Sequence, residues 1–175
     1  PIENSTCRLL SPEDNLLQVC LHTAKHSFVR APGFRLHTDV DRIVNFNIIN
    51  WDEFCLKVEY LKVRTPVYLA LLIPKVLLRS KVPKEVLQRL DFSPIKHLII
   101  QNWLLKVGLF GPDEKKWTKL GYILFNLCLF DTFYDLFRAV FPRKRDLNLE
   151  SENTFLLFFY FRRIFRLLFK RSKNT

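Results

Sequence analysis

Apolar residues recur at helical spacing through most of this 175-residue chain. Between positions 16 and 28 they gather on one face of a helical wheel: Leu16, Leu17, Cys20, Leu21, Ala24 and Phe28. No stretch alternates convincingly between apolar and polar residues, and the four glycines are too few for many tight hairpins. The pattern therefore predicts an all-α fold, an irregular bundle of about seven or eight helices, with no internal repeat.

Helix starts are marked by capping residues that are followed by proline or by acidic residues. Ser11 precedes Pro12 and two acids, so we expect it to cap the first helix. Asn50 precedes Glu53 in a variant of the capping box. Further boundary signals are Thr65-Pro66 and Ser93-Pro94 at helix starts and Gly108 at a helix end.

Three expectations concern the longer segments. Pro74 falls inside the apolar run 67–78, so the helix there should kink or break. Residues 113–141 are predicted to form one long helix that ends at Pro142, and residues 153–170 to form the last helix. The chain then divides into a helical region, residues 1–141, and a basic aromatic linker and helix, residues 142–175.

The formal net charge of +11 is unevenly distributed, because residues 142–175 hold nine Lys or Arg and three Asp or Glu. Such a tail fits an anionic partner such as nucleic acid, a nucleotide or an anionic membrane face, and it fits equally a solvated surface that keeps the protein soluble. The aromatic, basic helix expected at 153–170 can lie on a membrane surface. We favour instead a helix that docks on a core or partner while its arginines reach water.

The four cysteines are widely spaced and form no CxxC pair: Cys7, Cys20, Cys55 and Cys128. Their spacing argues against a thiolate zinc site and a disulfide framework, and it favours a reducing, cytoplasmic location. Residues 1–15 contain no apolar run of the kind found in signal peptides. Because the chain has no methionine and starts at Pro1, we expect a fragment or a processed product.

Candidate chemistry is concentrated near the start of the chain, where three of the four histidines lie. His22 and His26 are four residues apart and outside the apolar face of their helix, so they can converge on one ligand. The next segment supplies four further candidates: Arg35, His37, Asp39 and Asp41.

Two structural expectations follow for that segment. Thr38 is a candidate N-cap of a second helix, with Asp41 in its first turn. If this helix packs antiparallel to the first, Asp39 should reach His22 or His26, and Asp39→Asn should then be more damaging than Asp41→Asn.

Three interpretations of the cluster compete. As a metal site, His22, His26 and Asp39 would supply two imidazoles and a carboxylate, ligands that suit zinc or iron-like metals; we favour this one least. As a nucleotide or acceptor site, a histidine would donate to a phosphate or hydroxyl, Arg35 would pair with phosphate, and Asp39 would orient a histidine. As a structural cluster, a buried Asp39 would tie two helices together.

Three runs, residues 9–28, 34–44 and 49–72, resemble the C-terminal half of a bacterial family of uncharacterised nucleotidyltransferases. The segments at Val82-Pro83 and 130–142 also fit its layout. The positions that carry the resemblance are Ser11, Glu13, Asp14, Leu16, Leu17, His22, His26, Arg35, Asp39, Trp51 and Asp52.

The resemblance implies that the whole enzyme transfers a nucleoside monophosphate from an NTP to an unknown acceptor with Mg²⁺. This chain would supply the helical part that binds the nucleotide or the acceptor. The residues favoured for that role are His22, His26, Arg35 and Asp39, followed by His37 and Asp41.

One departure from the family pattern limits this expectation. The wider superfamily is associated with a Gly-Ser turn and paired magnesium-binding acids on a strand, but this chain has no Gly-Ser dipeptide, and Asp39 and Asp41 fall in a helical context. We therefore expect that the catalytic N-terminal α/β domain is missing, that this chain holds no metal, and that it is not catalytically competent alone. The alternative is a non-catalytic helical interaction module that binds a protein, nucleic-acid or membrane partner through its basic C-terminal helix.

Overall fold

The computed structural model describes residues 9–30, 33–108 and 118–140, and all of their regular structure is helical. The helices are α1 (Pro12–Lys25), α2 (Phe34–Phe46), α3 (Trp51–Tyr60), α4 (Arg64–Leu78), α5 (Lys84–Leu90), α6 (Pro94–Val107), α7 (Lys119–Cys128) and α8 (Phe133–Val140). The predicted all-α class is confirmed. The last helix expected from the sequence, residues 153–170, lies outside the described residues.

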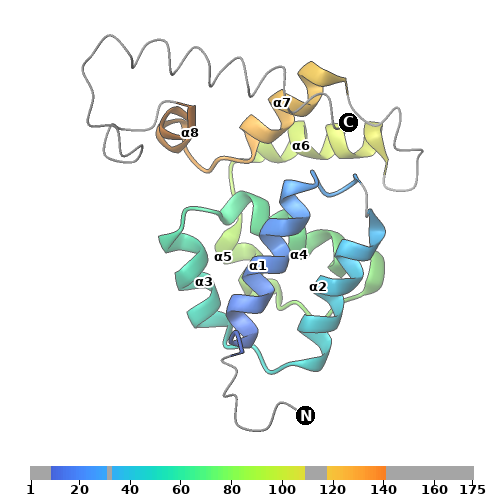
Figure 1. The fold of residues 1–175 in the computed structure, drawn as a ribbon, viewed down its shortest axis with the longest axis vertical. Helices are drawn as coiled ribbons and strands as arrows, with labels where there is room; N and C mark the ends of the chain where they lie inside the picture. The colour runs from blue at the N-terminus through green and yellow to red at the C-terminus, as the bar shows by residue number, and fades with distance from the viewer. Residues whose placement is uncertain (1–8, 31–32, 109–117, 141–175) are drawn as a thin grey trace, which may run out of the picture. The chain divides into compact units, whose positions relative to one another are not determined.

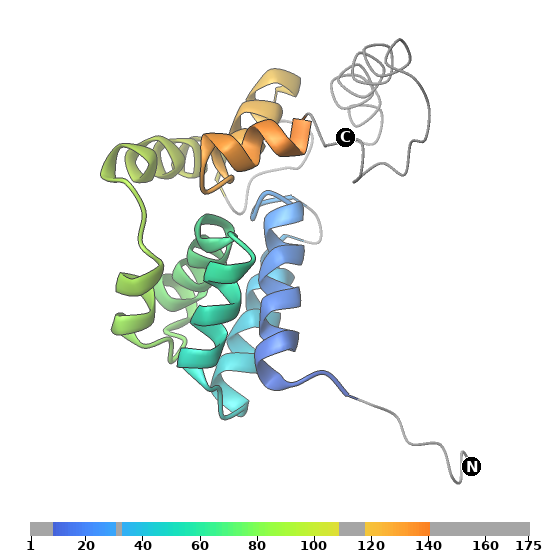
Figure 2. The same cartoon turned by 90° about the vertical axis from the view of Figure 1, so that its left-hand side faces the viewer.

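The chain divides into two compact units, one made of Pro1–Phe28 with Pro32–Asp91 and the other of Val29–Ala31 with Phe92–Thr175. In the first unit, α1 lies between α2 and α3, with α4 packed behind it (Figure 1). Figure 2 views the molecule from the α3 side and shows α3 between α1 and α5. Fully buried side chains from all five of its helices form its core, among them Leu16, Cys20, Val40, Phe54, Val58, Val67, Leu71 and Leu90.

α4 is the central helix of this unit, because it packs against α1, α2, α3 and α5. Of the two outcomes expected at Pro74, a kink or a break, the break is wrong: α4 continues through this buried proline to Leu78. Proline cannot make one of the helix's backbone hydrogen bonds, but packing against these four helices holds α4 together. The helix ends at Arg79, whose left-handed conformation (φ 59°) directs its backbone N–H to the carbonyl of Pro74.

α2 begins earlier than the sequence suggested. Gly33, with a positive φ of 63°, precedes its first residue Phe34, so the helix starts where the glycine allows the chain to turn. The prediction of Thr38 as N-cap is therefore wrong, and its hydroxyl instead donates to the carbonyl of Arg35 at 2.7 Å. Asp41 consequently lies in the middle of α2 rather than in its first turn.

The long helix predicted for residues 113–141 is wrong over the described positions, because α7 and α8 are separate helices. Thr118 caps α7 by accepting from the backbone N–H of Gly121 at 3.1 Å. Thr132 caps α8 in the same way through the N–H of Asp135, and its hydroxyl donates to the Asp135 carboxylate. The Thr132-x-x-Asp135 spacing is a capping signal. It starts a new helix inside the apolar run that had suggested one continuous helix.

In the second unit, α6 and α7 pack against each other. Trp103 on α6 and Phe125 on α7 meet with their ring centroids 5.9 Å apart, and Ile100 is buried beside them on α6. Lys96 donates to the carbonyl of Phe130 at 2.7 Å. Among the described residues, no helix is both long enough and apolar enough to cross a membrane.

Candidate functional site

Residues at the start of α1 take part in capping both α1 and α3. Ser11 caps α1 as predicted, accepting from the N–H of Asp14 at 3.1 Å, and Asn50 caps α3 by accepting from the N–H of Glu53 at 3.2 Å. The N–H of Asn50 donates to the carboxylate of Glu13 at 2.7 Å. In a capping box the acceptor of this N–H would be the side chain of the acid at position 53. Here α1 supplies the accepting carboxylate instead, and Glu13 thereby completes the cap of α3. The hydrogen bond from Asn50 lowers the pKa of Glu13.

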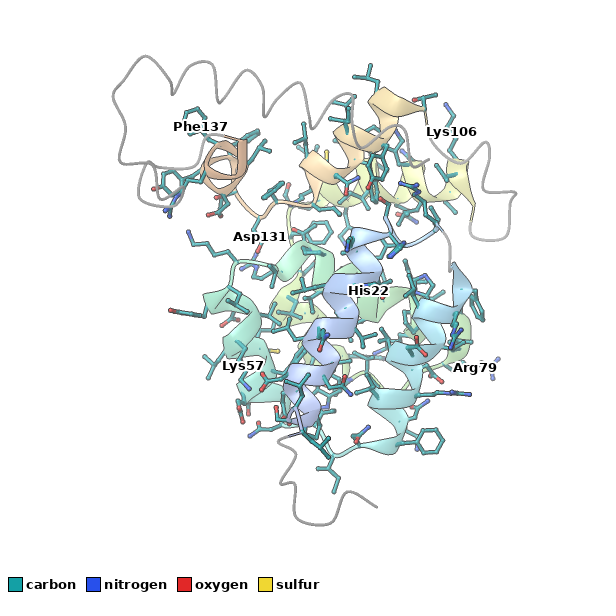
Figure 3. The ribbon with its side chains drawn as sticks, in the orientation of Figure 1. His22, Lys57, Arg79, Lys106, Asp131 and Phe137 are labelled. Atoms are coloured by element: carbon teal, nitrogen blue, oxygen red, sulfur yellow. The ribbon has the colours of Figure 1, made fainter. Side chains whose placement is uncertain are left out.

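Lys57 reinforces the same junction (Figure 3). Its ammonium lies 2.9 Å from a carboxylate oxygen of Asp14 on α1 and 2.9 Å from one of Glu53 on its own helix. The hydrogen bond to Asp14, and then that to Glu53, raise the pKa of Lys57. All three side chains are partly exposed, so these pairs fix geometry more than they add stability. Glu13 and Asp14 therefore join α1 to α3.

The side chain of His37 forms a hydrogen bond with the backbone. It has no exposed surface, and its Nε2 atom lies 2.7 Å from the carbonyl oxygen of Phe28. Because a carbonyl can only accept, Nε2 carries the proton. Burial lowers the pKa of His37, so the ring is neutral near pH 7, and its buried Nδ1 atom has no hydrogen-bond partner among the described residues.

The carbonyl that His37 holds belongs to an unusual turn. Ser27 and Phe28 both have positive φ, 51° and 65°, a conformation that costs energy for residues other than glycine. Both are fully buried. His37 therefore anchors the connection between α1 and α2, and this role leaves no exposed nitrogen for a substrate.

Asp41 also has a structural role. Its Oδ1 atom accepts from the hydroxyl of Ser80 at 2.5 Å and from the side-chain amide of Asn45 at 2.7 Å. The carbonyl oxygen of the Asn45 side chain in turn accepts from the N–H of Lys81 at 3.1 Å. These bonds connect α2 to the chain that follows α4.

Asp39 is half-buried on α2. Within the described part of the chain, Asp41 is the acid of this segment that accepts side-chain hydrogen bonds, and no hydrogen bond joins Asp39 to His22 or His26. The two acids project about 200° apart around the helix, because each residue advances about 100°. Asp39 and Asp41 therefore face different surroundings.

His22 and His26 do stand together, as their spacing predicted. Their ring centroids are 4.8 Å apart, with the planes inclined at 63°. His22 is exposed in the last turn of α1 and His26, half-buried, is the residue that ends the helix (Figure 3). The two rings form one polar group on the side of α1 that faces away from its apolar stripe.

Arg35 lies at the same end of the helix pair. It is exposed in the first turn of α2, and the short connection between α1 and α2 keeps the end of one helix beside the start of the other. No acidic residue lies in the first turn of α2, so the positive end of its dipole is not offset there. The structure thus brings His22, His26 and Arg35 to one end of the α1–α2 pair.

The described residues do not fit the magnesium ion that the resemblance implies. Asp39 and Asp41 point in different directions, and Asp41 is held by Ser80 and Asn45. Over residues 9–30, 33–108 and 118–140, no group of three or more His, Cys, Asp or Glu side chains lies close enough to hold a metal ion. That finding includes the trio His22, His26 and Asp39.

Residues 1–79 match the family described as uncharacterised nucleotidyltransferase. The resemblance inferred from the sequence is confirmed over these residues, whereas Val82-Pro83 and residues 130–142 lie outside the match. No curated protein and no solved structure matches the chain.

The nucleotidyltransferase match spans α1 to α4 and ends just after the last residue of α4. It includes every candidate site residue: His22, His26, Arg35, His37, Asp39 and Asp41. Sequence reasoning did not identify Asn45 and Ser80 as partners of Asp41. The spacing of Asp41 and Asn45 by one helical turn was a usable signal, but nothing local to Ser80 indicated its role.

Proposed function

We propose that α1 and α2 form a phosphate-contacting part of a nucleotidyltransferase, which binds the NTP or the acceptor through His22, His26 and Arg35. The observation that carries this proposal is the nucleotidyltransferase match over residues 1–79, which contains all three residues. His37 and Asp41 support the scaffold that presents them.

The chemistry of the three residues supports phosphate as the ligand. A guanidinium donates paired hydrogen bonds to phosphate oxygens, and it stays charged at any working pH. An imidazole can donate to a phosphate or to a hydroxyl. The start of α2 adds the partial positive charge of its dipole, with no acid in that turn to repel an anion.

A binding test separates this proposal from a purely structural cluster. Arg35→Ala should weaken binding of an NTP or its analogue at least about tenfold in calorimetric titration, since a charge-assisted hydrogen bond contributes about 1.5–3 kcal/mol. Arg42→Ala is the matched control, because Arg42 is also exposed and lies two turns further along α2 on nearly the same side. Equal effects of the two changes on binding would contradict the proposal.

The histidines are tested in the same titration. His22→Ala should weaken binding while leaving the helical circular dichroism signal unchanged, because His22 is exposed and outside the core. An unchanged affinity in His22→Ala and His26→Ala would remove the pair from the site and leave Arg35 alone.

A transfer assay tests whether this chain binds nucleotide without catalysing its transfer. Because Asp39 and Asp41 do not form a magnesium pair, we expect residues 1–175 alone to transfer no labelled nucleotide from any NTP to protein, nucleic acid or small acceptors with Mg²⁺ present. Labelling that depends on Mg²⁺ would place the catalytic centre within this chain. The interaction-module alternative rests on residues 142–175, which lie outside the described residues.

A further inference from the structure

The connection between α1 and α2 belongs partly to each of the two units. Ser27 and Phe28 are part of the first unit, whereas Val29–Ala31 are part of the second. Val29 has no exposed surface, and Arg30 is half-buried. The described residues of this connection are therefore packed rather than loose on the surface.

Within the second unit, Arg30 contacts an aromatic ring of α7. The central carbon of its guanidinium lies 5.0 Å from the centroid of the Tyr122 ring. A guanidinium within about 6 Å of a ring centroid is attracted by the negative face of the ring. Tyr122 is half-buried in the first turn of α7, and its backbone N–H donates to the carbonyl of Thr118 at 2.9 Å. The ring is thus presented by a regular, capped helix.

The residues that precede Arg30 adopt a conformation that has to be held. Ser27 and Phe28 both have positive φ, which costs energy for residues other than glycine. Their N–H groups donate to carbonyls in the last turn of α1, and His37 holds the carbonyl of Phe28. These bonds fix the turn from the first unit, while the contact between Arg30 and Tyr122 fixes the chain two residues later.

The same connection joins the residues of the proposed phosphate site. His26 directly precedes Ser27, and Arg35 lies five residues after Arg30. The position of the His26 imidazole relative to the Arg35 guanidinium therefore depends on the conformation of the connection. Binding is tighter when that conformation is fixed beforehand, because less conformational entropy is then lost on binding.

We propose that Tyr122 is a positioning residue for phosphate binding. Through Arg30 it holds the α1–α2 connection in the conformation that presents His26 and Arg35 to one ligand. This inference rests on the proposed function and adds to it a residue of α7, whereas the family match ends at residue 79.

The test is calorimetric titration of the full chain with ATP. Tyr122→Leu removes the ring and should weaken binding about three- to fivefold, the range expected for loss of a partly exposed cation–π contact. Tyr122→Phe keeps the ring and should bind ATP like the parent. Arg30→Gln should weaken binding as well, and Tyr122→Leu should add no further loss to it, because both changes remove the same contact.

Tyr134→Leu is the matched control. Tyr134 lies on α8 of the same unit, and the guanidinium of Arg138 lies 5.8 Å from the centroid of its ring. This pair is also a cation–π contact, but neither residue belongs to the α1–α2 connection. Tyr134→Leu should therefore leave the affinity for ATP unchanged.

Hydrogen exchange of backbone amides gives a second readout that needs no ligand. The N–H groups of Ser27 and Phe28 are bonded to carbonyls of α1 in the parent. Their exchange, followed by NMR, should accelerate in Tyr122→Leu and in Arg30→Gln, because the connection opens more often once its second anchor is lost. Tyr134→Leu should leave it unchanged.

The possible failures are distinguishable. Unchanged ATP affinity in Tyr122→Leu, or an equal loss in Tyr122→Phe, would overturn the role of Tyr122 and leave the proposed function standing. Unchanged exchange at Ser27 and Phe28 in Tyr122→Leu would show that the contact with Arg30 does not hold the turn, and would overturn the inference too. No ATP binding by the parent would overturn the nucleotide site itself, and with it the role of Tyr122 there.

Discussion

At the scale of single residues, His37 shows how a histidine from a site-like cluster can instead serve the backbone. In the sequence it is one of three histidines close to two aspartates, and nothing local separates it from His22 and His26. In the structure it is buried and bonded to the carbonyl of Phe28, while His22 is exposed. Burial, which depends on the helices packed around it, decides between the two roles.

This role of His37 predicts a graded response to substitution. His37→Ala should lower the free energy of unfolding by about 2–5 kcal/mol, because it leaves a cavity and an unpaired carbonyl. His37→Gln should lose less, because its amide nitrogen can take the place of Nε2. Urea titration measures both changes, and equal losses would show that the hydrogen bond to Phe28 contributes little.

The same histidine should make stability depend on pH. Burial lowers the pKa of His37 in the folded state, so the unfolded chain binds its proton more readily. The free energy of unfolding should therefore fall as the pH drops below about 6.5 and continue to fall until the pH passes the folded pKa. Urea midpoints measured across this range should show a shallower dependence in His37→Gln than in the parent.

At the scale of elements, Asp41 and Ser80 connect α2 to the chain after α4 across 39 positions of sequence. Asp41→Ala should lower the free energy of unfolding by about 1–3 kcal/mol, because it removes the acceptor of two hydrogen bonds. Asp39→Ala, the matched control, should change it by about 0.5 kcal/mol or less. This order reverses the one expected from the sequence.

A double-mutant cycle sharpens the Asp41 prediction. Ser80→Ala combined with Asp41→Ala should cost less than the sum of the two single changes, because both remove the same bond. Strict additivity in the urea titration would mean that the bond between Asp41 and Ser80 does not stabilise the fold.

The end of α4 offers a stabilising change. Arg79 adopts a left-handed conformation, with φ 59°, at a position where glycine is preferred, and its side chain is exposed. Arg79→Gly should raise the free energy of unfolding by about 0.5–1 kcal/mol, the balance of relieved strain and the greater flexibility of glycine in the unfolded chain. Arg79→Ala keeps the strain and should give no gain in melting temperature.

Helix boundaries could be predicted where the signal is local. Ser11 and Asn50 cap the helices that they were expected to start, because a cap depends on neighbours a few residues away. Ser93 also precedes its helix, where Pro94 marks the start. The continuation of α4 through Pro74 could not be predicted, because packing from four helices maintains α4 and these contacts have no local signature. The pairing of His22 with His26 could be predicted from helical spacing, but the partner of Asp41 could not.

At the scale of the whole molecule, the two units differ in how much core they hold. Among the described residues, every buried apolar side chain lies in the first unit except Val29, Ile100, Phe125 and Leu129.

The imbalance predicts that residues 1–91 fold without the rest of the chain. This fragment contains α1 to α5 and nearly all of the described core. It should give a helical circular dichroism spectrum and a cooperative thermal transition, because a closed core is what makes unfolding cooperative. A broad, non-cooperative transition would show that the first unit depends on residues 92–175.

The bond between Glu13 and the backbone of Asn50 has a consequence for the evolution of this protein. One carboxylate from α1 fills the position that an acid at 53 fills in a self-contained cap, and Glu53 is left to pair with Lys57. Selection should then act on positions 13 and 53 jointly. In homologous chains that lack an acid at position 13, we expect Glu or Gln to be retained at position 53, where it can turn back to the N–H of residue 50. Chains that keep Glu13 should be free to vary position 53.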